Sequence, residues 1–361
     1  MKEIPPPLPE LHNSFFVLNQ FGERVSFGRK LVFWLLLGLL SVILAEVTCA
    51  SSPYPFFDGW GLLVVTPLYT LHTLFLAGLI YQRKSVSLPV LLLAGMLFGL
   101  YEALITKVIW DPTWGDKASM AGGVAWLQTS VLVFFWHPWF AFIFPLLFGE
   151  VLFWASDEVS AALPAFMQKK AKWLWPMLLA ALCGVNQGAN TASIHSALLS
   201  TLEALGVFLL FSGLWKIVSK CQPLSMRNLL PKGRELVWIG ILLGLLYALS
   251  IPLIRPESLP RSAGPYLIIG GIYLFTILVL YSNLKKVNVA IPVIQPTARR
   301  FPWVKLGLFV LVYLVFAALS MQFKPAAHVV VIASWVFGLY IAQDLIRRAL
   351  VNALREAAKL D

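Results

Sequence analysis

The sequence predicts an all-α polytopic integral membrane protein with about ten transmembrane helices and a broken or re-entrant segment at 121–137. Of the 361 residues, 59% are hydrophobic and 12% are charged, whereas a soluble domain carries roughly 25% charged residues. Apolar runs of about 20 residues, the length needed to cross a bilayer, recur along the chain. Lys and Arg cluster in the short segments between these runs, as they do in cytoplasmic loops of membrane proteins.

Nine apolar runs have the length of a single span. They lie at about 31–50, 60–81, 88–110, 173–190, 194–218, 235–254, 264–283, 303–321 and 327–346. The interval 121–155 differs, because its roughly 35 residues are too many for one straight helix and too few for two spans with a loop. We therefore expect "AGGVAWLQTSVLVFFW" to dip into the membrane or lie along its outer surface, and "HPWFAFIFPLLFGEVLFWA" to cross. Pro138 would then occupy the first turn of the crossing helix, although a simple Pro kink gives the same pattern.

The distribution of basic residues predicts the orientation. If 121–155 crosses once in net terms, all but five of the 28 Lys and Arg residues lie on one side of the membrane. The exceptions are Lys107, Lys117, Arg255, Arg261 and Lys324. Two crossings would invert every later loop and abolish this bias. The positive-inside rule therefore predicts a cell-membrane protein with both termini in the cytoplasm.

The chain divides by polarity into five regions. They are a Pro-rich cytoplasmic arm (1–30), a polar-site-bearing half with six spans (31–218), a basic cytoplasmic loop (219–234), an apolar scaffold half with four spans (235–346) and a basic cytoplasmic tail (347–361). Nearly all ionisable residues inside the predicted spans belong to the first six. The functional site is therefore expected there.

Predicted depth places several of these residues at one level, in the outer half of the bilayer. Glu46, Glu102 and His137 are the candidate catalytic groups, because a charge in the bilayer interior is costly and normally faces a cavity or a bundle interior. Further polar residues at this level are candidate substrate-binding groups: Lys107, Asn186, Gln187, Asn190 and His195. We expect these residues to line one polar chamber that opens to the outside.

Structural explanations compete for several of these residues. Lys107 can extend its ammonium to the interface, Glu46 lies close to the surface, and His137 can mark a helix start. The stretch "NQGAN" also fits a glycine-containing helix end. His72, alone in "PLYTLHTLF", is expected to be a hydrogen-bonded core histidine. Glu102 has no such explanation, because its side chain is too short to reach water and needs a partner or a proton.

The first functional hypothesis is an intramembrane hydrolase or transferase that uses Glu and His as acid and base on a lipid-borne or membrane-embedded substrate. A Glu-bearing helix, a His after Phe-rich sequence and an Asn/His segment follow in an order that resembles the intramembrane glutamate proteases of the CAAX-processing type. Those enzymes carry E-E-x-x-x-R, F-x-x-x-H and H-x-x-x-N/D motifs. This chain departs from them: Glu102 is single, Lys107 has the wrong spacing, and Val133 stands four residues before His137. The resemblance covers about 100 residues and implies acid–base chemistry at Glu102 and His137.

Two other hypotheses remain open. A transporter or flippase would use broken helices around a polar centre, and ten spans divide into five plus five. A non-catalytic accessory subunit of a membrane complex would use the aromatic surface and short loops to contact a membrane-protein partner. Membrane lipids are partners under all three hypotheses.

The sequence also excludes several classes. The basic residues form no folded basic patch, so no nucleic-acid partner is expected. Cys49, Cys183 and Cys221 form neither a disulfide framework nor a metal motif, and no Gly-rich phosphate loop is present. A haem would need two facing histidines within the bilayer, and only His72 is predicted to be deep enough. No cofactor-binding residue is therefore predicted, and a metal is neither indicated nor excluded.

Overall fold

The computed structural model describes residues 17–18, 24–83, 86–115, 117–153, 157–164, 174–219, 224–284 and 302–358. Within these residues, nine helices are long and apolar enough to cross a membrane. They are Phe27–Val47, Gly61–Gln82, Leu88–Thr106, Trp126–Leu152, Ile194–Ser219, Arg234–Leu253, Ala263–Leu284, Trp303–Gln322 and Lys324–Arg355. The predicted span at 173–190 corresponds to α8 (Leu174–Asn190), whose 17 residues are near the lower limit for a span. The prediction of an all-α polytopic membrane protein is confirmed.

Several spans combine α-helical and π-helical segments. In chain order the helices are α1 (Phe27–Val42), η1 (Ile43–Val47), η2 (Gly61–Val65), α2 (Thr66–Gln82), α3 (Leu88–Gly99), η3 (Glu102–Thr106), the short η4 (Lys117–Ser119), α4 (Trp126–Val131), η5 (Leu132–Ile143), α5 (Phe144–Leu152), α6 (Glu158–Ala162), α8, α9 (Ile194–Ser219), α10 (Met226–Leu229), α11 (Arg234–Leu253), the short η6 (Pro256–Ser258), α12 (Ala263–Leu284), α13 (Trp303–Gln322) and α14 (Lys324–Ala357). The strands form two antiparallel hairpins, β1 (Val17–Leu18) with β2 (Arg24–Val25) and β3 (Met120–Ala121) with β4 (Val124–Ala125).

The segment expected to be broken or re-entrant at 121–137 has a different structure. In β3 and β4, Met120 pairs with Ala125 and Ala121 with Val124. The two residues between the strands, Gly122 and Gly123, both have positive φ, as a type I′ turn requires. One helical segment then runs from 126 to 152. It passes through Pro138 without a break, because the backbone there is π-helical. The hairpin and the long helix together explain why the apolar interval 121–155 is longer than a single straight span.

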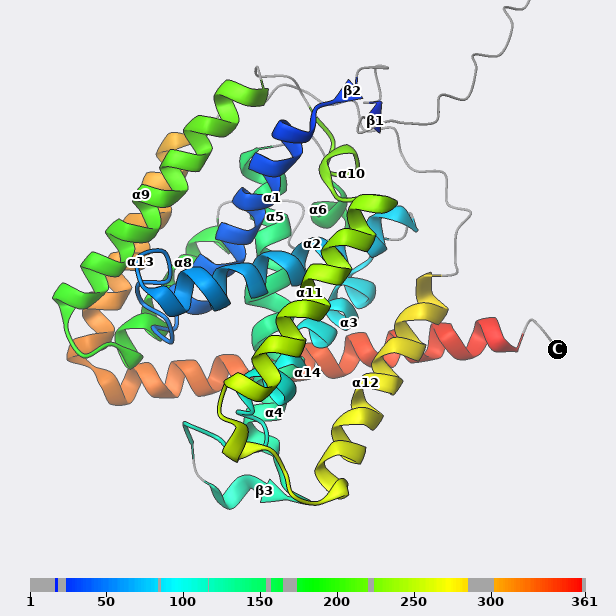
Figure 1. Cartoon of the computed structure of the whole chain (residues 1–361). Helices are drawn as coiled ribbons and strands as arrows, with labels where there is room; N and C mark the ends of the chain where they lie inside the picture. Colours follow the sequence, from blue (N-terminus) through cyan, green and yellow to red (C-terminus); the bar gives the residue numbers. More distant parts are fainter. Residues whose placement is uncertain are drawn as a thin grey trace, which may run out of the picture.

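Helices from the two halves of the sequence are interleaved (Figure 1). α13 packs along α8, and α14 crosses the bundle, contacting α8, α3, η5 and α12. The α8–α13 contact is so close that it requires glycine on α8. A Cβ on Gly184 would lie 2.2 Å from the carbonyl oxygen of Tyr313, and one on Gly188 would lie 2.3 Å from that of Ala317. Small residues four apart commonly permit such packing in membranes.

The first and the last membrane helix both extend beyond the boundaries predicted for their spans. α1 begins at Phe27, inside the predicted arm 1–30, and the ammonium of its buried Lys30 lies 2.8 Å from the carboxylate of Glu235 on α11. Residues 1–16 and 19–23 of that arm lie outside the described residues. α14 continues past 346 into the predicted tail, where Arg347 and Arg348 form ion pairs with Asp344, which precedes them on the same helix.

The orientation can be tested by labelling single cysteines in a variant whose native cysteines are replaced by alanine. Cysteines at Ser51 and Ser262 should react with a membrane-impermeant maleimide added outside, and one at Arg83 only after permeabilisation. These three positions are exposed, whereas Ser52 is buried. Labelling of Arg83 from outside, or of the other two only from inside, would contradict the positive-inside prediction.

Candidate functional site

Each of the three predicted catalytic residues lies in a π-helical segment. Glu46 is in η1, Glu102 begins η3, and His137 is near the centre of η5. A π-helix bonds residue i to i+5, and short π-helical turns occur frequently at functional sites. The structure brings the three side chains together in one cluster, although they come from three different spans.

His137 is buried and has a defined hydrogen-bonding pattern. Its Nδ1 lies 2.9 Å from the carbonyl oxygen of Leu132, which can only accept a hydrogen bond, so Nδ1 carries a proton. Its Nε2 lies 3.2 Å from the hydroxyl of Tyr69 and 3.2 Å from that of Tyr101. The same nitrogen is 3.6 Å from Oε1 of Glu102. A neutral His137 therefore presents Nε2 to the cluster as an acceptor.

Each carboxyl accepts hydrogen bonds from neighbouring hydroxyls. Glu46 accepts one from Tyr69 and another from Ser51. Glu102 accepts one from Thr106, one helical turn further along the chain. Glu102 is buried, whereas Glu46 is half-buried and Ser51 is exposed. The cluster therefore reaches the protein surface on the side of Glu46.

The tyrosine hydroxyls connect the two carboxyls to the imidazole. The hydroxyl oxygens of Tyr69 and Tyr101 are 3.1 Å apart, and both rings are buried. Among the described residues, no Lys or Arg forms an ion pair with Glu46 or Glu102. Burying unpaired charge is costly, so the arrangement favours protons shared between these groups. Such a network can hold and move protons.

A pair of glycines on α3 lets the helix of His137 approach closely. A Cβ on Gly95 would lie 2.3 Å from Cα of Pro138, and one on Gly99 would lie 2.9 Å from Cα of Val133 and 3.2 Å from Cβ of His137. The two glycines are four residues apart, a spacing that permits close helix packing in membranes. They therefore position His137 opposite Tyr101 and Glu102, which follow on the same span.

The loop after Glu46 is held against α9. Oε1 of Glu203 accepts a 2.9 Å hydrogen bond from the backbone N–H of Phe56. The hydroxyl of Tyr54 lies 3.0 Å from that of Ser196. These contacts place the loop that carries Ser51 over the surface side of the cluster.

The structure does not bring Lys107 to this cluster. Its buried ammonium donates to the carbonyl oxygens of Ile105 at 3.0 Å, Ile251 at 2.8 Å and Ile254. Two of these carbonyls belong to the C-terminal end of α11 and the residue that follows it, where a cation is favoured. Lys107 has a left-handed φ of 58° and ends the helix that carries Glu102. It therefore joins this helix end to α11.

Arg255 makes a second set of hydrogen bonds at the helix end that carries Lys107. Its guanidinium donates to the carbonyl oxygen of Thr106 at 3.0 Å and to Oδ2 of Asp111 at 2.6 Å. A hydrogen bond from Ser258 and the charge of Arg255 lower the pKa of Asp111. A lowered pKa makes the ionised pair stabilising at neutral pH, and this contribution is lost as the pH falls through the pKa of Asp111.

The remaining predicted substrate-binding residues form a separate group. The side-chain amide of Asn190 donates to Oδ1 of Asn186 at 2.9 Å, and that of Gln187 donates to the hydroxyl of Ser200 at 2.9 Å. His195 is exposed. Among the described residues, no hydrogen bond joins this group directly to the cluster of Glu46, Glu102 and His137, and a single shared chamber stays a prediction. The amide nitrogen of Gln187 lies 3.4 Å from the carbonyl oxygen of Val47, the residue after Glu46.

Sequence reasoning missed the hydroxyl partners of the cluster. Tyr69 and Tyr101 were overlooked, as were Ser51 and Thr106. A usable signal was present, because Thr106 follows Glu102 by four residues and Ser51 follows Glu46 by five, the spacings of one α-helical and one π-helical turn.

The expected core histidine agrees with the structure. In His72, Nδ1 lies 2.8 Å from the carbonyl oxygen of Leu68, and Nε2 lies 2.9 Å from the hydroxyl of Tyr247. Its ring stacks on Phe98 at 4.7 Å. Within the described residues, no group of three or more His, Cys, Asp and Glu residues has a geometry that could hold a metal ion.

Comparisons with known proteins show the family and leave the chemistry open. No solved structure matches the chain. An uncharacterized protein of Archaeoglobus fulgidus is 35% identical over 331 residues, covering 90% of this chain and 100% of the relative. Residues 35–356 match a family described as an uncharacterized membrane protein family. The chain is a multi-pass membrane protein that belongs to this family.

Proposed function

We propose that this protein is an intramembrane hydrolase that acts on a lipid-borne or membrane-embedded substrate through Glu102 and His137. The observation that carries the proposal is the buried cluster in which two carboxyls and an imidazole, all on π-helical segments, are joined by two tyrosine hydroxyls. Paired titratable groups held in a low-dielectric site are the components of general acid–base catalysis.

The hydrogen bonds are consistent with a bound water. The hydroxyl of Tyr69 donates to Glu46, and that of Tyr101 can donate to the oxygen of Tyr69. Nε2 of His137 is then free to accept, 3.6 Å from Oε1 of Glu102. A water placed beside this pair, within hydrogen-bond distance of both acceptors, would donate one hydrogen to each. Its oxygen lone pairs would remain available for attack.

The proposed reaction is hydrolysis of an ester or amide. Glu102 takes a proton from the water as the water oxygen forms a bond to the carbonyl carbon. The bond from this carbon to the leaving oxygen or nitrogen then breaks, and the leaving group receives the proton from Glu102. Water and substrate become an acid and an alcohol or amine, with no other reactant. His137 orients the water, and Tyr69 couples the cluster to Glu46.

The proposal is tested without knowing the substrate by incorporation of oxygen from labelled water. Purified protein in vesicles made from total membranes of the expression host is incubated in H₂¹⁸O, and lipids and peptides are analysed by mass spectrometry. The wild type should produce ¹⁸O-labelled carboxylic acids, and the His137→Ala variant should yield about 100-fold less, the scale of removing a positioned catalytic group.

If the protein is instead a transporter or flippase, the same vesicles should show lipid movement without incorporation of ¹⁸O. Fluorescent lipid analogues would become accessible to a quencher at a rate that depends on Glu102 and His137, while no ¹⁸O product forms. That result would contradict the hydrolase proposal. Equal labelling by wild type and His137→Ala would contradict it as well.

A further inference from the structure

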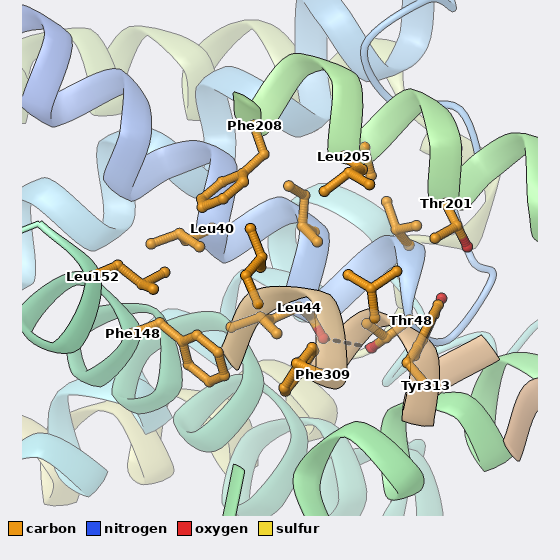
Figure 2. A pocket seen from close by; sticks show the side chains of 15 residues that line it. Leu40, Leu44, Thr48, Phe148, Leu152, Thr201, Leu205, Phe208, Phe309 and Tyr313 are labelled. Atoms are coloured by element: carbon orange, nitrogen blue, oxygen red, sulfur yellow. Dashed lines mark hydrogen bonds between the residues drawn. The ribbon is translucent and has the colours of Figure 1, made fainter. Parts of the chain in front are cut away.

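The membrane helices carry a second group of charged side chains, at the end of the bundle where α1 and α11 begin. The pocket next to η1, by contrast, has apolar walls, and the hydroxyl of its Thr48 donates to the carbonyl oxygen of Leu44 in the same span (Figure 2). The end where α1 and α11 begin is the one predicted to face the cytoplasm. Its charged residues are Lys30, Glu158, Arg227, Lys232 and Glu235.

Two of the three cations in this group have carboxylate partners. The ammonium of Lys30 lies 2.8 Å from each carboxylate oxygen of Glu235. Arg227 donates from Nε to Oε1 of Glu158 at 2.7 Å, and a second guanidinium nitrogen donates to Oε2 of the same carboxylate. Pairs in which both carboxylate oxygens are engaged are strong and geometrically specific. Both carboxylates are therefore occupied by other cations.

Lys232 is the third cation, and its ammonium has neither a hydrogen bond nor an ion pair within the described part of the chain. Its side chain is half-buried. Burial, together with the charges of Lys30 and Arg227, lowers the pKa of Lys232, and the charge of Glu235 offsets this only in part. An opposite charge close to an ammonium favours its charged form. The surroundings of Lys232 therefore favour an anion beside it.

The segment that carries Lys232 is held in place and has open space next to it. The indole N–H of Trp34 on α1 donates to the carbonyl oxygen of Leu229 at 2.8 Å, three residues before Lys232. Gly233 follows with a left-handed φ of 49°, and a Cβ there would meet nothing within 4 Å. An anion can therefore approach Lys232 at the start of α11 without displacing a side chain at Gly233.

An exposed apolar face lies further along α11. Val237, Trp238 and Ile241 are 61%, 64% and 44% exposed. Residues three and four apart lie on one face of a helix, and α11 is long and apolar enough to cross the membrane. This face therefore contacts hydrocarbon, and Lys232 lies beyond its cytoplasmic end. A phosphate and an acyl chain joined in one molecule match both features.

We infer that Lys232 binds the phosphate of an anionic phospholipid whose acyl chains lie along the exposed apolar face of α11. Basic residues next to a membrane helix attract anionic lipids. A zwitterionic phospholipid brings its own cation to the phosphate and therefore fits this positive site less well. The site is separate from the cluster of Glu46, Glu102 and His137, and the inference does not depend on the proposed hydrolysis.

The test is native mass spectrometry of the full-length protein in detergent, with equal amounts of phosphatidylglycerol and phosphatidylcholine that have identical acyl chains. The wild type should retain one phosphatidylglycerol in preference to phosphatidylcholine. Lys232→Gln should weaken this retention about fivefold, which corresponds to the roughly 1 kcal/mol that one basic side chain contributes near a membrane surface. Lys232→Arg should restore it. The control is Arg234→Gln, whose side chain is exposed and whose loss should leave retention unchanged.

Three results would overturn the inference. Equal retention of the two lipids would show that the apolar face alone binds them. Unchanged retention in Lys232→Gln, or an equal loss in Arg234→Gln, would show that Lys232 has no particular role. Displacement of the lipid by millimolar inorganic phosphate would assign the site to free phosphate.

Two further variants keep the test decisive. If Lys232→Gln does not fold, Lys232→Ala is read in the same way. Glu102→Gln should retain phosphatidylglycerol as the wild type does, whatever the ¹⁸O assay shows. The lipid site and the hydrolase proposal can therefore fail separately.

Discussion

Replacing Glu102 by Gln is expected to lower ¹⁸O incorporation per folded molecule by a factor of about 100 or more, the scale of removing a positioned acid or base. The amide has nearly the same shape as the carboxyl, and its oxygen can still accept the hydrogen bond from Thr106. It cannot take a proton from water. Thermal unfolding in detergent should therefore show a folded protein with little loss of stability, while turnover is lost.

Glu150 provides a matched control, because it is another buried glutamate in a different part of the chain. Its carboxyl accepts hydrogen bonds from the backbone N–H groups of Val159 at 2.9 Å and Ser160 at 3.1 Å. Glu150→Gln should cost about 1–3 kcal/mol of stability and leave turnover per folded molecule unchanged. The opposite result, a Glu102→Gln protein that is destabilised yet fully active, would make Glu102 structural and remove the central group of the proposed mechanism.

Hydropathy was sufficient to predict the nine described helices that are long and apolar enough to cross a membrane, and depth within them brought together part of the candidate site. A residue's position within a span gives its depth, and depth predicted that Glu46, Glu102 and His137 share one level. In the structure these three residues meet in one cluster. Whether they act together in catalysis stays a prediction.

Depth does not give the direction in which a side chain points around its helix. Gln187 and Glu46 have similar predicted depths, yet the amide of Gln187 donates to the hydroxyl of Ser200 and the carbonyl oxygen of Val47, not to Glu46. The direction depends on which helices pack closely, and that depends on glycine spacing. Gly95 and Gly99 on α3, with His137 packed against them, carry information that the hydropathy pattern lacks.

The π-helical segments explain two further differences from the sequence-based predictions. Pro138 was expected to begin a helix, and η5 instead accommodates it within a continuous helix. Ser51 bonds Glu46 from five residues away, at the end of η1. These features depend on backbone hydrogen bonding that shifts by one residue within an otherwise helical run, and no apolar periodicity reports that shift.

Lys107 is the residue whose structural surroundings differ most from the predicted role in substrate binding, and its substitution has the second large expected effect. In Lys107→Met the side chain keeps its length but leaves the carbonyl oxygens of Ile251 and Ile254 without their ammonium donor. Hydrogen bonds to charged groups contribute about 1.5–3 kcal/mol each. We therefore expect a loss of about 3 kcal/mol in the free energy of unfolding, measured by denaturation in detergent.

The same substitution at Lys117 is the control, because that ammonium is exposed and its ion pair with Asp111 is long, with an N–O distance of 3.6 Å. Exposed ion pairs contribute roughly 0–1 kcal/mol, so Lys117→Met should be nearly neutral. Lys107→Met should also keep its KM in the ¹⁸O assay once turnover is expressed per folded molecule, because its ammonium contacts backbone and not the cluster. A Lys107→Met protein of native stability with a raised KM would instead place this ammonium on the substrate. The helix end that carries Glu102 would then be held by Arg255 and Asp111 alone.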